Sequence, residues 1–467
     1  MQKNITKIVT LFQQYRSTGE ENYKEQAEAL LDEIVGSCNR SMPLSYYHGL
    51  CGIGAAIEYL IRNNFVKGEA DEILADIDNA VISVISNRPP MEANIENGLL
   101  GLACYLYERL YYRPKSEEPI VLTLKENIIY LIDWMEDMLL NNTIEKNYCE
   151  YYFVLILLHQ LNIFNVKVEK MFEWCDYEIE HKEQNLQKQL DEQKGYVDST
   201  YSNSREEALK RIPPISIVIP LRIESIERRD NLHCVLQYLL QSPFVHIELL
   251  EADRERRFFF NPHERIRYNF VYDEENVFYR TRYLNVLLRN ALFPIVGVWD
   301  ADVLIPESQL VAAIGHIMEG CVLCFPYNGD FRYLNNERSK AIRENINRLQ
   351  KKEGCRLMGR PSVGGAFLVN RDKYLQSGGE NEGFYGWGPE DAERVKRLEI
   401  LGLPISRTQG SLYHLNHERK LDIGIDNQKK AQHNQKVLIN TCGMSKTELK
   451  YMVGKHLGIF SYLDNWE

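Results

Sequence analysis

The stretch from Gly364 to Gly402 constrains the fold of this chain more than any other. It reads GGAFLVNRDKYLQSGGENEGFYGWGPEDAERVKRLEILG. The pattern predicts a buried strand over 366–369, a loop rich in glycine and aromatic residues over 378–388, and then a helix. The first turn of that helix is acidic, which the free N–H groups and the dipole of a helix N-terminus favour. The acids therefore either cap the helix or belong to a site.

The loop before the acids favours a site. Phe384, Tyr385 and Trp387 stand between glycines, which let the backbone turn sharply and leave rings exposed. An exposed ring stacks on the C–H face of a sugar, whereas the sugar hydroxyls need an acceptor such as a carboxylate. We therefore expect Tyr385, Trp387 and Gly388 to border a saccharide acceptor.

The motif Trp387-Gly388-Pro389-Glu390-Asp391 resembles the WGxED hallmark of the β-1,4-galactosyltransferases and of the bacterial chondroitin-polymerase-type transferases. Those families share the α/β, Rossmann-like GT-A fold, and the order of motifs is similar over roughly residues 213–420. The resemblance implies inverting transfer of a hexose or N-acetylhexosamine in a single displacement. The sequence departs from the family pattern where Pro389 replaces glycine and where Ala392-Glu393 replace further acids. The identity of the acceptor therefore stays open.

The two acids of the motif have different expected roles. A transfer to a hydroxyl group needs a carboxylate that accepts the departing proton. We predict Asp391 as this general base, with Glu390 orienting hydroxyl groups of the donor or the acceptor.

Asp300-Ala301-Asp302 predicts a metal site. The motif follows an apolar run over 294–299, so both acids stand at a strand end, where residues i and i+2 point to the same side. Two carboxylates near one point repel each other, and a hard divalent cation with phosphate oxygens removes that repulsion. We expect Asp302 to bind the metal and Asp300 to face the donor.

A further ligand is expected from Ser411-Leu412-Tyr413-His414-Leu415-Asn416-His417. An imidazole ligand favours Mn²⁺, with Mg²⁺ as the alternative. In the chondroitin-polymerase-type pattern a histidine follows a tyrosine, so the resemblance ranks His414 above His417. The sequence alone leaves open which of the two is the ligand, or whether either is only structural.

Further strands are predicted over 215–220, 246–250 and 266–272. Donor-binding residues are expected where such strands end, because ligands of α/β sheets bind beyond the carboxyl ends of the strands. By resemblance, Pro220 and Arg222 stand where the transferases contact the nucleotide, and Arg280 and Asn285 stand near the donor diphosphate. Asp253, at the end of the second predicted strand, is a candidate for binding the base or the ribose. A loop ion pair with Arg254 or Arg256 is the alternative for Asp253.

The first 180 residues predict an all-α domain. Apolar residues recur at helical spacing in several segments, and strand signals are nearly absent. Two GLxG motifs, at 49–52 and 98–101, each followed by an aliphatic residue, predict repeated helical hairpins that pack closely at their glycines. HGLCGIGAAIEYL resembles the repeats of lanthionine synthetase C-like proteins, an α/α toroid. The zinc ligands of that family have no counterpart before residue 200, so we expect a partial toroid that serves as a structural remnant or a platform.

The expected organisation is an all-α domain over 1–180, a charged helical linker over 181–212 and a GT-A domain over 213–467, with the boundary near 195–212. The net charge of −11 argues against nucleic acid as a partner. No segment resembles a signal peptide or a membrane anchor. We therefore expect a cytoplasmic enzyme, with peripheral membrane contact left open. Its expected partners are a UDP-sugar and a saccharide or glycoconjugate acceptor.

Two other functions stay open at this point. In the first, the chain binds a nucleotide-sugar without catalysis and the helical half recruits a partner or a peptide. In the second, the toroid-like half modifies peptides, although the missing zinc ligands count against this. The set of Asp300, Asp302, Asp391 and His414 favours an active glycosyltransferase.

Overall fold

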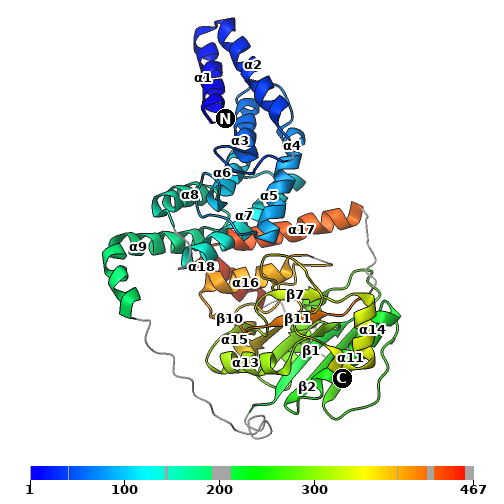
Figure 1. The fold of residues 1–467 in the computed structure, drawn as a ribbon. Coiled ribbons are helices and arrows are strands. Elements are labelled where there is room, and N and C mark those ends of the chain that lie inside the picture. The colour runs from blue at the N-terminus through cyan, green and yellow to red at the C-terminus, as the bar shows by residue number, and fades with distance from the viewer. Residues whose placement is uncertain are drawn as a thin grey trace. The chain divides into compact units, whose positions relative to one another are not determined.

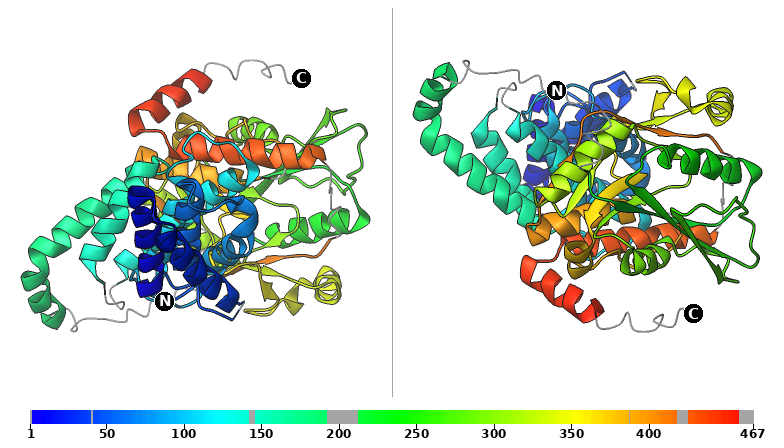
Figure 2. Two further views of the ribbon diagram at one scale, coloured as in Figure 1. Left: turned by 90° about the horizontal axis from the view of Figure 1, so that it is seen from above. Right: turned by 90° about the horizontal axis from the view of Figure 1, so that it is seen from below.

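The computed structural model describes residues 2–39, 41–141, 146–191, 212–386, 388–417 and 425–457. The chain divides into two compact units, Met1–Tyr196 and Val197–Glu467 (Figures 1 and 2). The first is helical and the second is a mixed α/β unit, which confirms the predicted fold classes. Residues 192–211, most of the predicted linker, lie outside the described residues.

The first unit contains helices and no strand among its described residues. The helices are α1 (Gln2–Thr18), α2 (Glu21–Ser37), α3 (Leu50–Arg62), α4 (Ala70–Ile73), α5 (Ala75–Asn87), α6 (Leu99–Leu110), α7 (Pro119–Leu140), α8 (Tyr148–Leu161) and α9 (Asn165–Asp191). α9 continues into the region predicted as a charged linker. No helix that the structure describes is both long and apolar enough to cross a bilayer.

Both GLxG motifs make the same close backbone contact. α3 and α6 each begin directly after the first glycine of a motif. At all four glycines an added Cβ would collide with the carbonyl oxygen of the residue six positions earlier. The pairs are Gly49 with Pro43 (2.0 Å), Gly52 with Tyr46 (1.9 Å), Gly98 with Glu92 (2.1 Å) and Gly101 with Ile95 (2.3 Å). Glycine is required because the preceding turn folds back onto the start of each helix.

A buried ion-pair cluster joins the helices of this unit. Arg109 of α6 is fully buried and donates to Asp78 of α5 and to Asp71 of α4, each at 2.8 Å. It also pairs with Glu58 of α3, and the Tyr105 hydroxyl donates to Asp78 at 2.6 Å. Removing one partner of such a cluster leaves a buried charge unpaired, which is strongly destabilising.

The second unit is built on a seven-stranded sheet with the order β10-β6-β9-β4-β1-β2-β3. The four strands from β4 to β3 run parallel, whereas β9 is antiparallel to both of its neighbours. The strands are β1 (Ile215–Leu221), β2 (Val245–Asp253), β3 (Ile266–Tyr272), β4 (Ile295–Trp299), β6 (Leu323–Phe325), β9 (Ala366–Asn370) and β10 (Ile405–Arg407). The predicted strands at 215–220, 246–250, 266–272, 294–299 and 366–369 are therefore confirmed. Cys324 of β6 and Cys321, which precedes this strand, are both free thiols.

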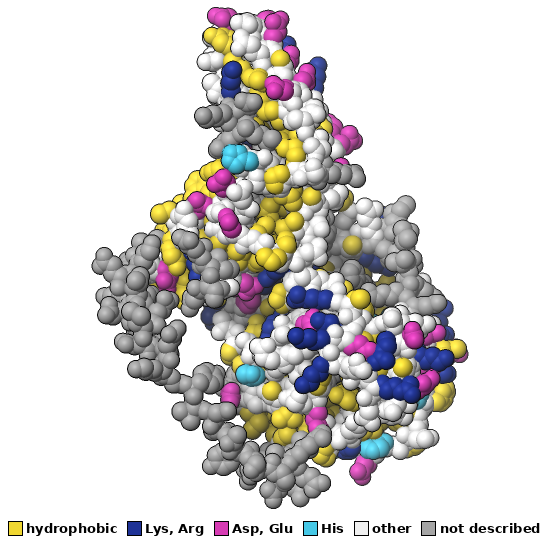
Figure 3. Space-filling model, viewed as in Figure 1, with side chains coloured by type: hydrophobic (Ala, Val, Ile, Leu, Met, Phe, Trp, Pro, Cys, Tyr) yellow, Lys and Arg dark blue, Asp and Glu magenta, His cyan; other side chains and the backbone are white. Residues whose placement is uncertain are grey.

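The strands are connected by helices, and further helices follow the last strand. They are α11 (Ile226–Leu239), α12 (Arg280–Asn290), α13 (Glu307–Met318), α14 (Asn336–Glu344), α15 (Arg371–Gln376), α16 (Glu390–Leu401), α17 (Ile425–Cys442) and α18 (Lys446–Leu457), with a 3₁₀ turn at Ile346–Arg348. On the face shown in Figure 3, basic and acidic side chains are interspersed over this unit.

A second sheet of four short strands has the order β5-β11-β7-β8. The strands are β5 (Val303–Leu304), β7 (Asp330–Tyr333), β8 (Cys355–Arg356) and β11 (Ser411–His414). β7 and β8 lie in the segment between β6 and β9. β5 directly follows the Asp300–Asp302 turn and pairs antiparallel with β11, so that Val303 lies opposite His414. This pairing joins two parts of the chain that are far apart in sequence.

Candidate functional site

Asp302, His414 and His417 form a cluster at the junction of β5 and β11. One ligand atom from each lies within 4.8 Å of the others. His414 Nε2 lies 3.4 Å from Asp302 Oδ1, and His417 Nε2 lies 3.1 Å from Asp302 Oδ2. The backbone fixes this geometry, because Leu415 N–H donates to the Asp302 carbonyl at 2.8 Å. Both histidines, rather than one of the two, therefore face Asp302.

The electrostatics of the cluster keep Asp302 ionised. Burial alone would raise the pKa of Asp302, but His414, a hydrogen bond from His417 and the charge of Arg228 lower this pKa below its ordinary value. The two imidazoles also line a pocket of about 680 Å³, together with Tyr333 of β7 and Arg338 of α14. The cluster therefore combines one carboxylate with two imidazoles that border this pocket.

Asp300, the first acid of the motif, takes part in a different contact. Its Oδ1 accepts from Arg280 Nη2 at 2.6 Å, and its backbone N–H donates to the Gly365 carbonyl at 2.9 Å. Burial raises the pKa of Asp300, and Asp302 and Asp391 raise it further, whereas Arg280 opposes them. Asp300 is therefore influenced both by Asp302 of the cluster and by Asp391 of α16.

Arg280 supplies a positive charge to this acidic group. Burial would lower its pKa, but the carboxylates of Asp300, Asp391 and Glu390 outweigh burial and raise the pKa. Its Nη1 is buried and has no hydrogen-bond partner among the described residues. A buried donor without a partner is costly, so this atom is suited to an oxygen of a bound ligand.

Asp391 and Glu390 open α16, as the sequence predicted. Asp391 is about one third exposed, and its Oδ1 accepts from Arg394 Nη1 at 2.8 Å. Glu390 Oε2 is buried and has no hydrogen-bond partner among the described residues. Burial and the neighbouring Asp391 raise the pKa of Glu390 to about 8, against the opposing charge of Arg280. Glu390 is therefore protonated at neutral pH, whereas a capping acid would be ionised.

The raised pKa of Glu390 predicts a pH-dependent stability difference. Between its unfolded pKa, about 4.3, and its folded pKa, about 8, the native state binds more protons than the unfolded state. The free energy of unfolding of the wild type should therefore fall as the pH rises through this window. Glu390→Gln cannot ionise, so its stability advantage over the wild type should grow by on the order of 1 kcal/mol or more between pH 5 and pH 9.

Chemical denaturation of the metal-free wild type and of Glu390→Gln across this pH range measures the difference. Glu399→Gln is a matched control on the same helix, where the partly exposed Glu399 pairs with Lys396. Parallel stability curves for the wild type and Glu390→Gln would show that Glu390 ionises normally.

On the predicted donor side, Pro220, Arg222 and Asp253 lie together at the carboxyl ends of β1 and β2. Arg222 donates to the Ala252 carbonyl at 2.8 Å and to Asp273 Oδ2 at 2.6 Å. Asp253 Oδ1 accepts from the Arg254 N–H at 2.7 Å, and Oδ2 lies 3.7 Å from Arg257 Nε. Pro220 is buried within β1. The ion-pair partner of Asp253 is therefore Arg257, not Arg254 or Arg256 as in the alternative, and Arg254 contributes only its backbone N–H.

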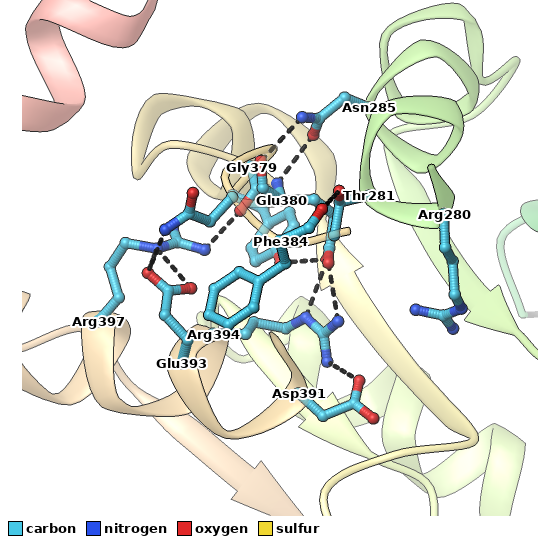
Figure 4. A network of polar contacts seen from close by, with 12 residues as sticks. Arg280, Thr281, Asn285, Gly379, Glu380, Phe384, Asp391, Glu393, Arg394 and Arg397 are labelled. Carbon is cyan, nitrogen blue, oxygen red and sulfur yellow. Dashed lines mark hydrogen bonds and ion pairs between the residues drawn. The ribbon is translucent and has the colours of Figure 1, made fainter. Parts of the chain in front are cut away.

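Asn285 occupies a structural position instead of facing the acidic group. Its side chain is buried, donates to the Glu380 carbonyl and to Glu382 Oε1, and accepts from the Glu380 N–H, each at 2.8 Å. Figure 4 shows it bound to the loop before α16. All of these contacts hold that loop, so the geometry does not support the expected contact of Asn285 with a diphosphate.

Tyr385 and Gly388, two of the predicted acceptor residues, lie against α17. The Tyr385 ring packs on His433 with centroids 4.8 Å apart, and its carbonyl accepts from Asn434 Nδ2 at 3.1 Å. A Cβ on Gly388 would lie 2.4 Å from Asn434 Nδ2, so glycine is needed there for close packing. Trp387 lies outside the described residues.

Residues 346–420 match a family model described as the N-terminal domain of galactosyltransferase. The second unit therefore contains a segment that is similar to this family. This segment includes Glu390, Asp391, His414 and His417, whereas Asp302 precedes it. No curated protein matched the chain.

Several solved structures are similar at low scores. The catalytic domain of Drosophila β1,4-galactosyltransferase 7 in complex with xylobiose is 18% identical, with a TM-score of 0.30, over 48% of this chain and 81% of that one. Glucosyl-3-phosphoglycerate synthase from Mycobacterium tuberculosis, in complex with Mn²⁺, UDP and phosphoglyceric acid, is 16% identical, with a TM-score of 0.32, over 53% of this chain and 85% of that one. At these scores the likeness is general and does not identify a substrate.

Proposed function

We propose that this chain is a metal-dependent, inverting glycosyltransferase of the GT-A type. It moves a hexose or N-acetylhexosamine from a UDP-sugar to a hydroxyl group of a saccharide acceptor. The main support is the convergence of Asp302, His414 and His417 within 4.8 Å. A separate carboxylate, Asp391, is close enough to Asp300 to raise the pKa of Asp300, as Asp302 of the cluster also does.

The cluster suits a divalent cation with mixed ligands. One carboxylate and two imidazoles favour Mn²⁺, because Mg²⁺ prefers an oxygen shell with retained waters. Asp302, His414 and His417 would hold the ion, which when bound supplies charge neutralisation for the diphosphate leaving group. The pocket beside both histidines would leave room for that group.

The donor is held by the remaining charged groups. The buried Nη1 of Arg280 would donate to an oxygen of the donor near the reacting carbon. Asp300 fixes Arg280 through the 2.6 Å ion pair, so the guanidinium is oriented before the donor binds. Arg222 and Asp253, at the ends of β1 and β2, would border the nucleoside.

Asp391 is the proposed general base. As the acceptor oxygen forms its bond to the anomeric carbon, the bond from that carbon to the diphosphate oxygen breaks. The hydroxyl proton moves to the Asp391 carboxylate and the diphosphate leaves with the electron pair. Glu390, protonated at neutral pH, would donate a hydrogen bond to a sugar oxygen. Tyr385 and Trp387 would border the acceptor sugar.

A panel of donors tests this proposal. UDP-glucose, UDP-galactose, UDP-N-acetylglucosamine and UDP-N-acetylgalactosamine are each incubated with the full chain and Mn²⁺, with and without saccharide acceptors, and UDP release is measured. The proposal expects Mn²⁺-dependent release with at least one donor, accelerated by an acceptor. Tight binding of a UDP-sugar without release in any combination would instead favour the non-catalytic alternative.

A further inference from the structure

We propose that the buried ion pair between Glu380 and Arg394 holds Asp391 in its reactive orientation, so that Arg394 is a positioning residue. This inference deepens the proposed transfer reaction and rests on it. Figure 4 shows Arg394 between Glu380, in the loop before α16, and Asp391, in the first turn of α16.

The guanidinium of Arg394 divides its donors between the two acids. Its Nε and Nη2 donate to the two Glu380 oxygens, both at 2.8 Å, and its Nη1 donates to Asp391 Oδ1, also at 2.8 Å. Arg394 is buried, with 1% of its side chain exposed, and its guanidinium stacks over the Phe367 ring at 4.1 Å. These contacts fix the orientation of the planar guanidinium, so its bond to Asp391 favours one orientation of that carboxylate.

Glu380 is itself fixed. Its Oε1 accepts from the Tyr374 hydroxyl at 2.6 Å, and its backbone N–H donates to Asn285 at 2.8 Å. Burial alone would raise the pKa of Glu380, but Arg394 and Tyr374 lower it, so Glu380 stays ionised beside Arg394. The loop before α16 therefore sets the position of Arg394, and Arg394 in turn sets that of Asp391.

The second oxygen of Asp391 has a different environment. A Cβ added to Gly364 would lie 2.6 Å from Asp391 Oδ2. This oxygen therefore lies close to Gly364, where there is room for it only because glycine has no side chain. The carbonyl of the next residue, Gly365, accepts from the Asp300 N–H. Arg394 thus occupies Oδ1 and leaves Oδ2 on the Asp300 side, which assigns Oδ2 as the atom that accepts the proton.

Arg397 offers a matched control on the same helix. It is 2% exposed, pairs with Glu393 at 3.1 Å and donates to the carbonyls of Ser377 and Gly379, each at 2.5 Å. None of its contacts with described residues is to Asp391. Loss of Arg397 should therefore cost stability comparable to the loss of Arg394, but it should affect the base less, because the bond from Arg394 to Asp391 stays in place.

The test compares Arg394→Met, Arg394→Lys and Arg397→Met in the full chain by steady-state kinetics and thermal denaturation. Arg394→Met should lower kcat by about 10- to 100-fold, because small displacements of a reacting group cost rates of this size. The donor KM should change by less than about threefold, since a positioned base acts in the transition state. Arg394→Lys should recover part of kcat, whereas Arg397→Met should lower kcat by a clearly smaller factor than Arg394→Met.

Gly364→Ala keeps the proposal testable if Arg394→Met does not fold. Its new methyl group would displace Asp391 Oδ2 and should lower kcat while all contacts of Arg394 to Glu380 are retained. Equal loss of kcat in Arg394→Met and Arg397→Met, or unchanged kcat in Arg394→Met and Gly364→Ala, would overturn the positioning role alone. A wild type inactive with every donor would overturn the proposed function, and the positioning role with it.

Discussion

Asp302→Asn should abolish Mn²⁺-dependent turnover, lowering kcat/KM by roughly 10³-fold or more. Loss of an outer-shell partner alone typically costs 10- to 100-fold in metal affinity or activity, and Asp302 is the sole carboxylate of the described cluster. Asparagine has nearly the same shape but no charge to hold a cation between two imidazoles. Mn²⁺ titration followed by thermal shift, together with UDP release, measures metal binding and turnover separately.

Asp330→Asn is the control for this prediction. Asp330 lies in the neighbouring strand β7, is largely buried, and pairs with Arg332 and with the Ser411 hydroxyl of β11. Its loss disturbs the small sheet without removing a ligand, so the Mn²⁺ response should persist. His414→Ala and His417→Ala should each weaken Mn²⁺ binding. An Asp302→Asn protein that kept its Mn²⁺ response would contradict the proposed metal site.

Asp391→Asn should lower kcat by about 10²-fold or more while leaving donor binding nearly intact. A positioned general base contributes roughly this factor, and asparagine cannot accept the proton. Its amide oxygen can still accept from Arg394, so the local structure should persist. Donor affinity from equilibrium binding of the UDP-sugar, compared with kcat from UDP release, separates the two effects.

Glu399→Gln, at the far end of α16, is the control for Asp391→Asn. It removes a carboxylate from the same helix, paired with Lys396, and should leave kcat unchanged. If Asp391→Asn weakened donor binding but turned over normally, Asp391 would belong to the donor site and would not be the base.

Local sequence patterns predicted most of the sheet and the acidic start of α16. β-branched runs such as 215–219 identify buried strands because such strands are apolar on both faces. The close packing at the glycine pair of α3 was also predictable from the sequence, since only glycine permits the backbone contact found there. These features depend on neighbours in sequence, which is the information that periodicity carries.

The sequence did not reveal how distant residues pair. His417 was ranked below His414 because only a resemblance separated them, whereas the structure brings both to Asp302. A histidine three residues after another was the available signal. Arg394 and Glu380 were not identified, because an arginine on a helix ordinarily indicates a solvated face. By resemblance, Asn285 was expected to contact the donor diphosphate, whereas in the structure its side-chain amide binds the loop before α16.

The two-residue strand β5 gives the site an unusual sensitivity to chain length. Side chains alternate between the faces of a strand, so slipping β11 by one residue against β5 would turn His414 to the opposite face. A single-residue deletion between β10 and β11 should therefore be more damaging to metal binding than most substitutions within that loop.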